Sequence, residues 1–123
     1  MQKESALILF AHGARDPRWA APFQRLRQMT QDSLPEVSVQ LAFLEFMSPS
    51  LPELVAQLVA DGCRKVSICP VFLGQGGHVL RDLPVMADTL RHSYPDLEVQ
   101  LAAAIGEDPD VLLAIRDYCL KLV

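Results

Sequence analysis

Four short apolar runs alternate along this chain with segments that have helical features. The runs cover residues 5–11, 37–43, 65–72 and 97–105. Continuous apolar runs of this length are typical of strands that are buried on both faces, as in parallel sheets. Strands and helices that alternate in this way favour a parallel sheet with helices on both faces, joined by right-handed crossovers. We therefore predict an α/β fold with the element order βαβαβαβα.

The length of the chain limits this fold to a small sheet. There are 123 residues, with no linker, low-complexity segment or internal repeat. Such a length suits one compact domain with a modest core. We expect a three-layer sandwich around a four-stranded parallel sheet, built as a single domain over residues 1–123. For the strands we expect the flavodoxin-like order 2-1-3-4.

Capping residues mark the starts of three predicted helices. Asp16 and Asp108 each precede a proline, so that an acidic N-cap is followed by proline at the first helical position. Ser50 and Glu53 have the spacing of a capping box, and Gly62 is placed to end the helix that they open. These signals predict helices that begin at residues 17, 51 and 109.

The third of the four predicted helices has a less distinct start. We expect it to begin near Asp82, which would act as its N-cap, with Pro84 in its first turn. It should end near Tyr94, because Pro95 follows.

Composition excludes several classes of function. The net charge is −4 with no stripe of lysine or arginine, which argues against nucleic acid as a partner. No apolar run approaches the roughly 20 residues of a membrane span. The first residues lack the shape of a signal peptide, and the three cysteines show no C-x-x-C spacing. We expect a cytoplasmic protein with reduced, packed thiols and no membrane partner.

Polar and glycine residues follow every predicted strand. His12 follows the first strand, Glu45 the second and the glycine-rich loop 73–78 the third. Ligands of open α/β sheets bind at the carboxyl ends of the strands, where the strand order reverses. In the order 2-1-3-4 the first and third strands are neighbours at that point. We therefore expect His12 and His78 to face each other across one crevice.

Two histidines and a glutamate at one edge allow two kinds of chemistry. Together they can hold a divalent metal with coordination positions left open, and a neutral imidazole can accept a proton near physiological pH. Glycines in the loop allow backbone N–H groups to approach a ligand closely. Structural roles stay open for His12 beside its glycine turn and for Glu45 as a turn residue.

Other enzyme classes with similar local features lack their required residues here. Histidine phosphatases have an arginine directly before the histidine, whereas this chain has Ala11. The G-x-S-x-G elbow of α/β-hydrolases and the P-loop pattern G-x-x-x-x-G-K-[ST] are both absent from the sequence.

Three stretches together resemble the CbiX/SirB family of sirohydrochlorin chelatases, the type II chelatases. They are LILFAHGARDPRW, LAFLEFMSPSL and ICPVFLGQGGHVLRDLP, which lie between residues 7 and 84 in the right order and spacing, within a resemblance that covers nearly the whole chain. The family pattern HGSRDP appears as HGARDP, with Ala14 in place of the usual serine. The pattern P-x-F-L-x-x-G-x-H-x-x-x-D-x-P is matched from Pro70 to Pro84.

The resemblance implies the insertion of a divalent metal, Co²⁺ or else Ni²⁺ or Fe²⁺, into sirohydrochlorin in cobalamin- or sirohaem-type biosynthesis, with no organic cofactor. It implies that His12 is proton acceptor and metal ligand, that His78 is a second metal ligand, and that Glu45 contacts substrate or metal. Short members of the family pair as homodimers. The family's substrate-binding loop falls on Phe72, Leu73, Gly74, Gln75, Gly76 and Gly77.

The carboxylates of such a substrate need cationic partners on this acidic protein. Arg15, Arg18 and Arg81 are the candidates nearest to the matched motifs. Two other functions stay open: a non-catalytic carrier of tetrapyrrole or metal, and a phosphate-binding flavodoxin-like module. Imidazole and carboxylate ligands do not select among the three metals.

Overall fold

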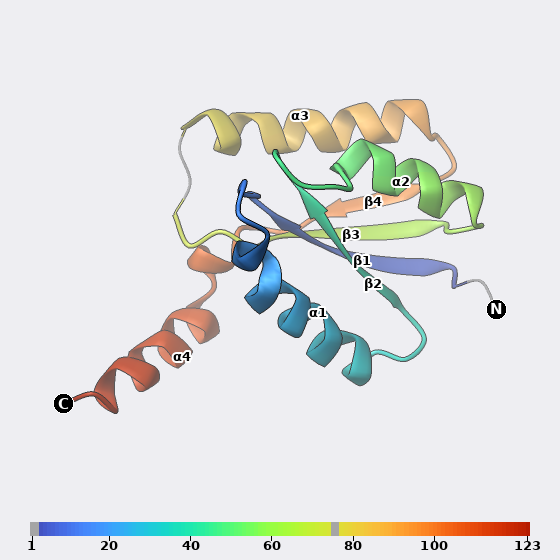
Figure 1. The fold of residues 1–123 in the computed structure, drawn as a ribbon. Coiled ribbons are helices and arrows are strands. Elements are labelled where there is room, and N and C mark those ends of the chain that lie inside the picture. Colours follow the sequence, from blue (N-terminus) through green and yellow to red (C-terminus); the bar gives the residue numbers. More distant parts are fainter. Residues whose placement is uncertain (1–2, 75–76) are drawn as a thin grey trace.

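The computed structural model describes residues 3–74 and 77–123, which form a parallel sheet with flanking helices (Figure 1). All four strands run parallel in the order β2-β1-β3-β4, which confirms both the predicted fold class and the strand order. The strands are β1 (Ser5–Ala11), β2 (Ser38–Phe43), β3 (Lys65–Pro70) and β4 (Glu98–Leu101). The first and third strands therefore lie side by side, as the placement of the site requires.

Two of the strands end earlier than the apolar runs predict. The third run extends to residue 72 and the fourth to residue 105, but β3 ends at Pro70 and β4 at Leu101. Phe72 and Ala104 are nevertheless buried, at 7% and 6% exposure. Burial therefore continues at these two positions after the ladder has ended, whereas Ala102 and Ala103, directly after β4, are exposed.

The two faces of the sheet are covered unequally. Helices α2 (Leu51–Ala60) and α3 (Gly77–Ser93) lie over one face and α1 (Ala21–Ser33) over the other (Figure 1). The main core lies beneath α2 and α3, where the fully buried side chains include Ile8, Phe10, Val55 and Ile68. A smaller cluster of Ala11, Ala20 and Phe43 lies on the α1 side.

The last helix departs from the expected arrangement. Helix α4 (Pro109–Leu120) does not lie on either face but projects from the carboxyl end of the sheet (Figure 1). Its main contacts are with the short 3₁₀-helix η2 (Ile105–Glu107) directly before it. None of its residues is buried.

The predicted helix caps are present. Asp108 accepts a hydrogen bond from the backbone N–H of Val111 at the start of α4. The capping box of α2 has both of its bonds: Ser50 N–H donates to Glu53 Oε1 at 3.1 Å, and Glu53 N–H to Ser50 Oγ at 3.3 Å. Asp16 caps a 3₁₀-helix, η1 (Pro17–Ala20), which leads into α1. These short-range signals predicted the starts correctly because the cap and its partner are close in sequence.

The prediction for α3 was wrong at its start. The helix begins at Gly77, so Asp82 is not its N-cap and Pro84 lies inside it. Leu83, Ala87 and Leu90 recur on one face and are buried, and Val79 packs against the same core. Burial of this face favours helix on both sides of Pro84 despite the N–H group that proline lacks.

Two further expectations concern the thiols and the membrane. The three thiols are all free: Cys63 is buried, Cys69 half-buried and Cys119 exposed, so the expectation of packed thiols was wrong for Cys119. Burial raises the pKa values of Cys63 and Cys69, which keeps both in the less reactive thiol form. Within residues 3–74 and 77–123, no helix is both long and apolar enough to span a membrane.

Candidate functional site

The carboxyl edge of the sheet brings His12 and Glu45 together. His12 directly follows β1, and Glu45 lies two residues beyond the end of β2. His12 Nε2 lies 3.1 Å from Glu45 Oε1, within hydrogen-bond distance. Both side chains are about half exposed, at 49% and 48%, so a ligand can reach them from solvent. The pair thus combines a proton acceptor with a carboxylate at the predicted ligand-binding edge.

Backbone hydrogen bonds fix the separation of this pair. Leu44 N–H donates to the carbonyl of Ala11 at 2.9 Å, and Glu45 N–H donates to the carbonyl of His12 at 3.0 Å. These bonds continue the pairing of β1 with β2 beyond the ends of the strands. The two side chains are therefore positioned by the sheet itself.

Gly13 is required by the close approach of these two segments. Its φ is +99°, and a Cβ atom added there would lie 1.9 Å from the backbone oxygen of Glu45. Both the conformation and the contact exclude a side chain. The glycine of the HG dipeptide therefore serves the fold of the site.

Phe72 supports the ring of His12 from the protein side. The two rings meet edge to face with centroids 6.0 Å apart, and Phe72 meets Phe10 in the same way at 6.1 Å. Because Phe72 is 7% exposed, its ring packs beneath the site and presents little surface to a ligand. Its side chain therefore packs against His12, and the substrate contact of Phe72 implied by the motif stays a prediction.

The rest of the glycine-rich loop is only partly described. Leu73 is 62% exposed, and an added Cβ at Gly74 would meet no atom within 4 Å. Gln75 and Gly76 lie outside the described residues. The backbone of Gly77 and His78 forms the start of α3, while the side chain of His78 lies outside the described part of the structure. The predicted facing of His12 and His78 stays a prediction.

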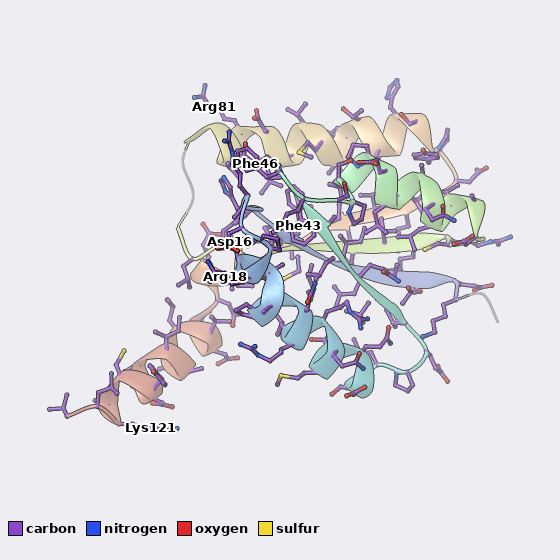
Figure 2. All side chains as sticks on the ribbon, viewed as in Figure 1. Asp16, Arg18, Phe43, Phe46, Arg81 and Lys121 are labelled. Carbon is purple, nitrogen blue, oxygen red and sulfur yellow. The ribbon has the colours of Figure 1, made fainter. Side chains whose placement is uncertain are left out.

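Of the predicted arginines, Arg18 is already paired. Its Nε and Nη2 atoms donate to the Asp16 carboxylate at 2.7 to 3.1 Å, and its backbone N–H donates to Asp16 Oδ1 (Figure 2). This pairing lowers the pKa of Asp16 and raises that of Arg18. The positive charge of Arg18 is therefore paired with Asp16 at the helix start.

Arg15 differs from Arg18 in its surroundings. The Arg15 guanidinium carbon is 4.9 Å from the centre of the Phe46 ring, and Arg81 is an exposed residue of α3 at the same end of the molecule (Figure 2). Among the salt bridges of the described residues, the arginine partners are Arg18, Arg91 and Arg116, and Arg15 is not one of them. The charge of Arg15 therefore faces an aromatic ring rather than a carboxylate.

Phe46 is a site residue that the sequence analysis did not single out. It directly follows Glu45, its φ is +65° and its side chain is 57% exposed. Met47 N–H donates to the Glu45 carbonyl at 2.8 Å, which closes a three-residue γ-turn around Phe46. The only signal in the sequence is a large aromatic residue in a loop directly after a candidate acid.

A hollow beside Phe46 forms part of the same surface. It has a volume of about 320 Å³ and is lined among others by Ala14, Arg15, Phe43 and Met47. A larger hollow of about 570 Å³ lies at the turns that enter β3 and β4 and has no histidine in its lining. The smaller hollow is the relevant one because it adjoins the loop that carries Glu45.

The described residues supply only part of a metal site. No group of three His, Cys, Asp or Glu side chains in the described part of the chain is placed to hold a metal ion. His12 and Glu45 supply one imidazole nitrogen and one carboxylate, which suit Co²⁺, Ni²⁺ and Fe²⁺. A tightly held resident metal needs more ligands than these two, whereas transient contact with a metal that is in transfer does not.

Sequence comparison finds chelatases among the relatives of this chain. The sirohydrochlorin cobaltochelatase of Methanococcus aeolicus is 32% identical over 79 residues, which cover 64% of this chain and 55% of that protein. The one from Methanocaldococcus jannaschii is 30% identical over 89 residues, covering 72% and 62%. The matched part is thus little more than half the length of these relatives.

Structural comparison finds the same fold over nearly the whole chain. A CbiX protein from Marinobacter aquaeolei VT8 superimposes with a TM-score of 0.83 at 32% identity, covering 95% of both chains. The sirohydrochlorin chelatase SirB from Bacillus subtilis subspecies spizizenii, solved with cobalt, has a TM-score of 0.79 at 19% identity. That match covers 98% of this chain and 51% of SirB, and it shows the fold alone.

A match to a whole-family sequence model extends these pairwise results. The model of the CbiX family matches residues 6–120, which include His12, Glu45 and the loop after β3. Since the match spans almost the entire chain, this protein belongs to the CbiX family.

Proposed function

We propose that this chain is a sirohydrochlorin chelatase, which inserts Co²⁺, or else Ni²⁺ or Fe²⁺, into the tetrapyrrole as a step of cobalamin- or sirohaem-type biosynthesis. The observation that carries this proposal is the exposed His12–Glu45 pair, 3.1 Å apart at the carboxyl edge. The cobaltochelatase names of the relatives support the same reaction. The metal is a substrate of this reaction, and one domain over residues 1–123 carries it out.

His12 is the group that removes a proton from the macrocycle. Metal insertion releases two protons from pyrrole nitrogens. If His12 Nε2 carries the ring proton and donates it to Glu45, the lone pair lies on Nδ1, which then accepts a pyrrole proton or contacts the metal. Glu45 orients the ring and offsets the positive charge that the imidazole gains.

His78 is the second metal ligand in this proposal. The motif places it there, and its backbone lies at the start of α3, after the strand that neighbours β1. Leu73 and Gly74 are exposed on the same loop and contact the macrocycle, together with Gln75, Gly76 and Gly77. Phe72 acts through His12, as its edge-to-face contact indicates.

Arg15 and Arg81 contact the carboxylates of the substrate. Both are exposed: Arg15 lies in the loop after β1 that also carries His12, and Arg81 lies near the start of α3. Arg18 contributes more weakly than Arg15, because the Asp16 carboxylate already neutralises it. We place the reaction in the cytoplasm, where an exposed free thiol such as Cys119 stays reduced.

We further propose that the protein acts as a homodimer, with α4 covered by a second copy. The apolar side chains of α4 are 38–64% exposed from Leu112 to Leu120, on more than one side of the helix. A helix with apolar residues on several sides is normally buried. Reciprocal packing of α4 between two copies would cover these side chains and give a closed, symmetric pair.

The proposal is tested by an anaerobic absorption assay of sirohydrochlorin with each of the three metals. Many turnovers above the uncatalysed rate, lost in the His12→Ala/His78→Ala double variant, are the expected result. A spectral change that stops at one equivalent per site would instead identify a carrier. Binding of inorganic phosphate without any binding of sirohydrochlorin would favour the phosphate-binding module and overturn the proposal.

A further inference from the structure

The turn at Phe46 places a large apolar ring where the backbone favours glycine. A phenylalanine at φ +65° has an uncommon conformation that costs free energy. The turn is also exposed, so burial of the ring in the core does not offset this cost. Residues held in such conformations cluster at functional sites, where the surrounding structure fixes them.

The surrounding structure does fix this turn from both sides. Glu45 N–H donates to the His12 carbonyl, and Met47 packs against the small core cluster that includes Phe43. Phe43 N–H in turn donates to the carbonyl of Pro49 at 2.9 Å, which closes the loop. These contacts fix the conformation of the loop. The Phe46 ring is therefore kept exposed next to Glu45, the candidate acid.

Arg15 completes the arrangement with a positive charge. Its guanidinium lies 4.9 Å from the ring centre, close enough for a cation–π contact. Arg18, three residues further on, is held by Asp16. The two arginines therefore have different partners. Arg18 pairs with Asp16 at the helix start, whereas the Arg15 guanidinium contacts an aromatic ring. This contact leaves the N–H groups of Arg15 able to bind an anion.

From these observations we infer that Phe46 and Arg15 form one recognition element for the substrate. The exposed part of the ring contacts the flat, apolar part of an anionic macrocycle, and the guanidinium binds a carboxylate on its rim. The hollow of about 320 Å³ between residues 14–17 and 43–48 receives that rim. This inference rests on the proposed function and adds to it the residues that determine substrate affinity.

The test measures binding of metal-free sirohydrochlorin by the quenching of Trp19, the single tryptophan of the chain. Phe46→Ala should weaken binding about tenfold, since it removes the apolar contact area of the ring together with its aromatic contact. Arg15→Gln should weaken binding about fivefold, and less for a porphyrin that carries fewer carboxylates. Met29→Ala and Arg25→Gln, which remove the same kinds of exposed side chain from α1, should bind as the wild type does.

Phe46→Gly separates a role in binding from a role in stability. Glycine adopts positive φ freely, so this variant should melt at the wild-type temperature or above while still binding about tenfold more weakly. In the turnover assay, the KM should rise while kcat changes little.

Three outcomes would overturn the inference. Wild-type affinity in both Phe46→Gly and Arg15→Gln would show that neither residue recognises the substrate. A loss of melting temperature in Phe46→Gly that parallels its loss of binding would assign Phe46 to packing. Absence of sirohydrochlorin binding by the wild type would overturn the proposed function, and this inference with it.

Discussion

His12 Nε2 and Glu45 Oε1 lie 3.1 Å apart although 33 positions separate the two residues in the sequence. The parallel pairing of β1 with β2 accounts for this proximity, because it brings the carboxyl ends of both strands to one edge. An imidazole bonded to a carboxylate is a common arrangement for proton transfer and for metal contact. Substitutions of His12 and Glu45 should therefore slow metal insertion.

Replacing His12 with alanine should reduce the rate of metal insertion by about a hundredfold or more, the typical contribution of a general base. Glu45→Gln keeps a hydrogen-bonding partner for the ring but removes the charge, so its effect should be smaller. Initial rates of metal insertion at saturating sirohydrochlorin measure both effects. Binding of the metal-free tetrapyrrole should persist in each variant. A wild-type rate in His12→Ala would remove His12 from the mechanism.

Gly13→Ala should destabilise the protein by more than about 1 kcal/mol, because alanine resists a positive φ and its Cβ would collide with the Glu45 backbone. Gly74→Ala is the matched control, since an added Cβ there meets nothing within 4 Å. Urea unfolding of both variants measures the difference. Equal midpoints for the two would mean that the turn at Gly13 relaxes without cost.

Ser50→Ala should lower the stability by about 1 kcal/mol near neutral pH, through loss of the N-cap bond to the Glu53 N–H group. The bonds with Ser50 also lower the pKa of Glu53. A lowered pKa stabilises the fold above the unfolded-state pKa, and this contribution disappears as the pH falls through the folded-state pKa. The difference between variant and wild type should therefore shrink in acid. Unfolding midpoints measured in neutral and acidic buffers test this, and a difference that grows in acid would contradict it.

Ile115→Glu should convert a homodimer to a monomer, because it places a charge among the apolar side chains of α4. Val85→Glu introduces the same charge at a 63% exposed position of α3 and should leave the dimer intact. Light scattering after size-exclusion chromatography measures the mass of each. A wild-type protein with the mass of one chain at micromolar concentration would contradict the proposed pairing.

The features that the sequence predicted correctly depend on short-range signals or on the strand pattern. The caps at Asp108 and Ser50 bond to residues three positions away. The parallel sheet follows from the alternation of elements, whereas the order 2-1-3-4 was expected from the flavodoxin-like fold. Both are confirmed, and the pairing of β1 with β2 brings His12 and Glu45 to one edge. Family motifs added the assignment of roles, which spacing alone left open.

The features that the sequence did not predict depend on tertiary contacts. Helix α3 extends through Pro84 because buried side chains on both sides of the proline stabilise it. Phe72 matches a substrate-loop motif yet lies beneath His12, and only the packing distinguishes these two positions. The positive φ of Phe46 arises from the bracing of its loop by other segments, which no local pattern of residues reveals.

The hydrogen bonds from Leu44 to Ala11 and from Glu45 to His12 make the site a continuation of the sheet. The amide hydrogens of these two residues should consequently exchange with solvent as slowly as those of the central strands, since both are released only when the sheet opens. The site should therefore not unfold locally before the rest of the sheet does. Activity and secondary structure should then be lost together, at one denaturant concentration and along a single unfolding curve.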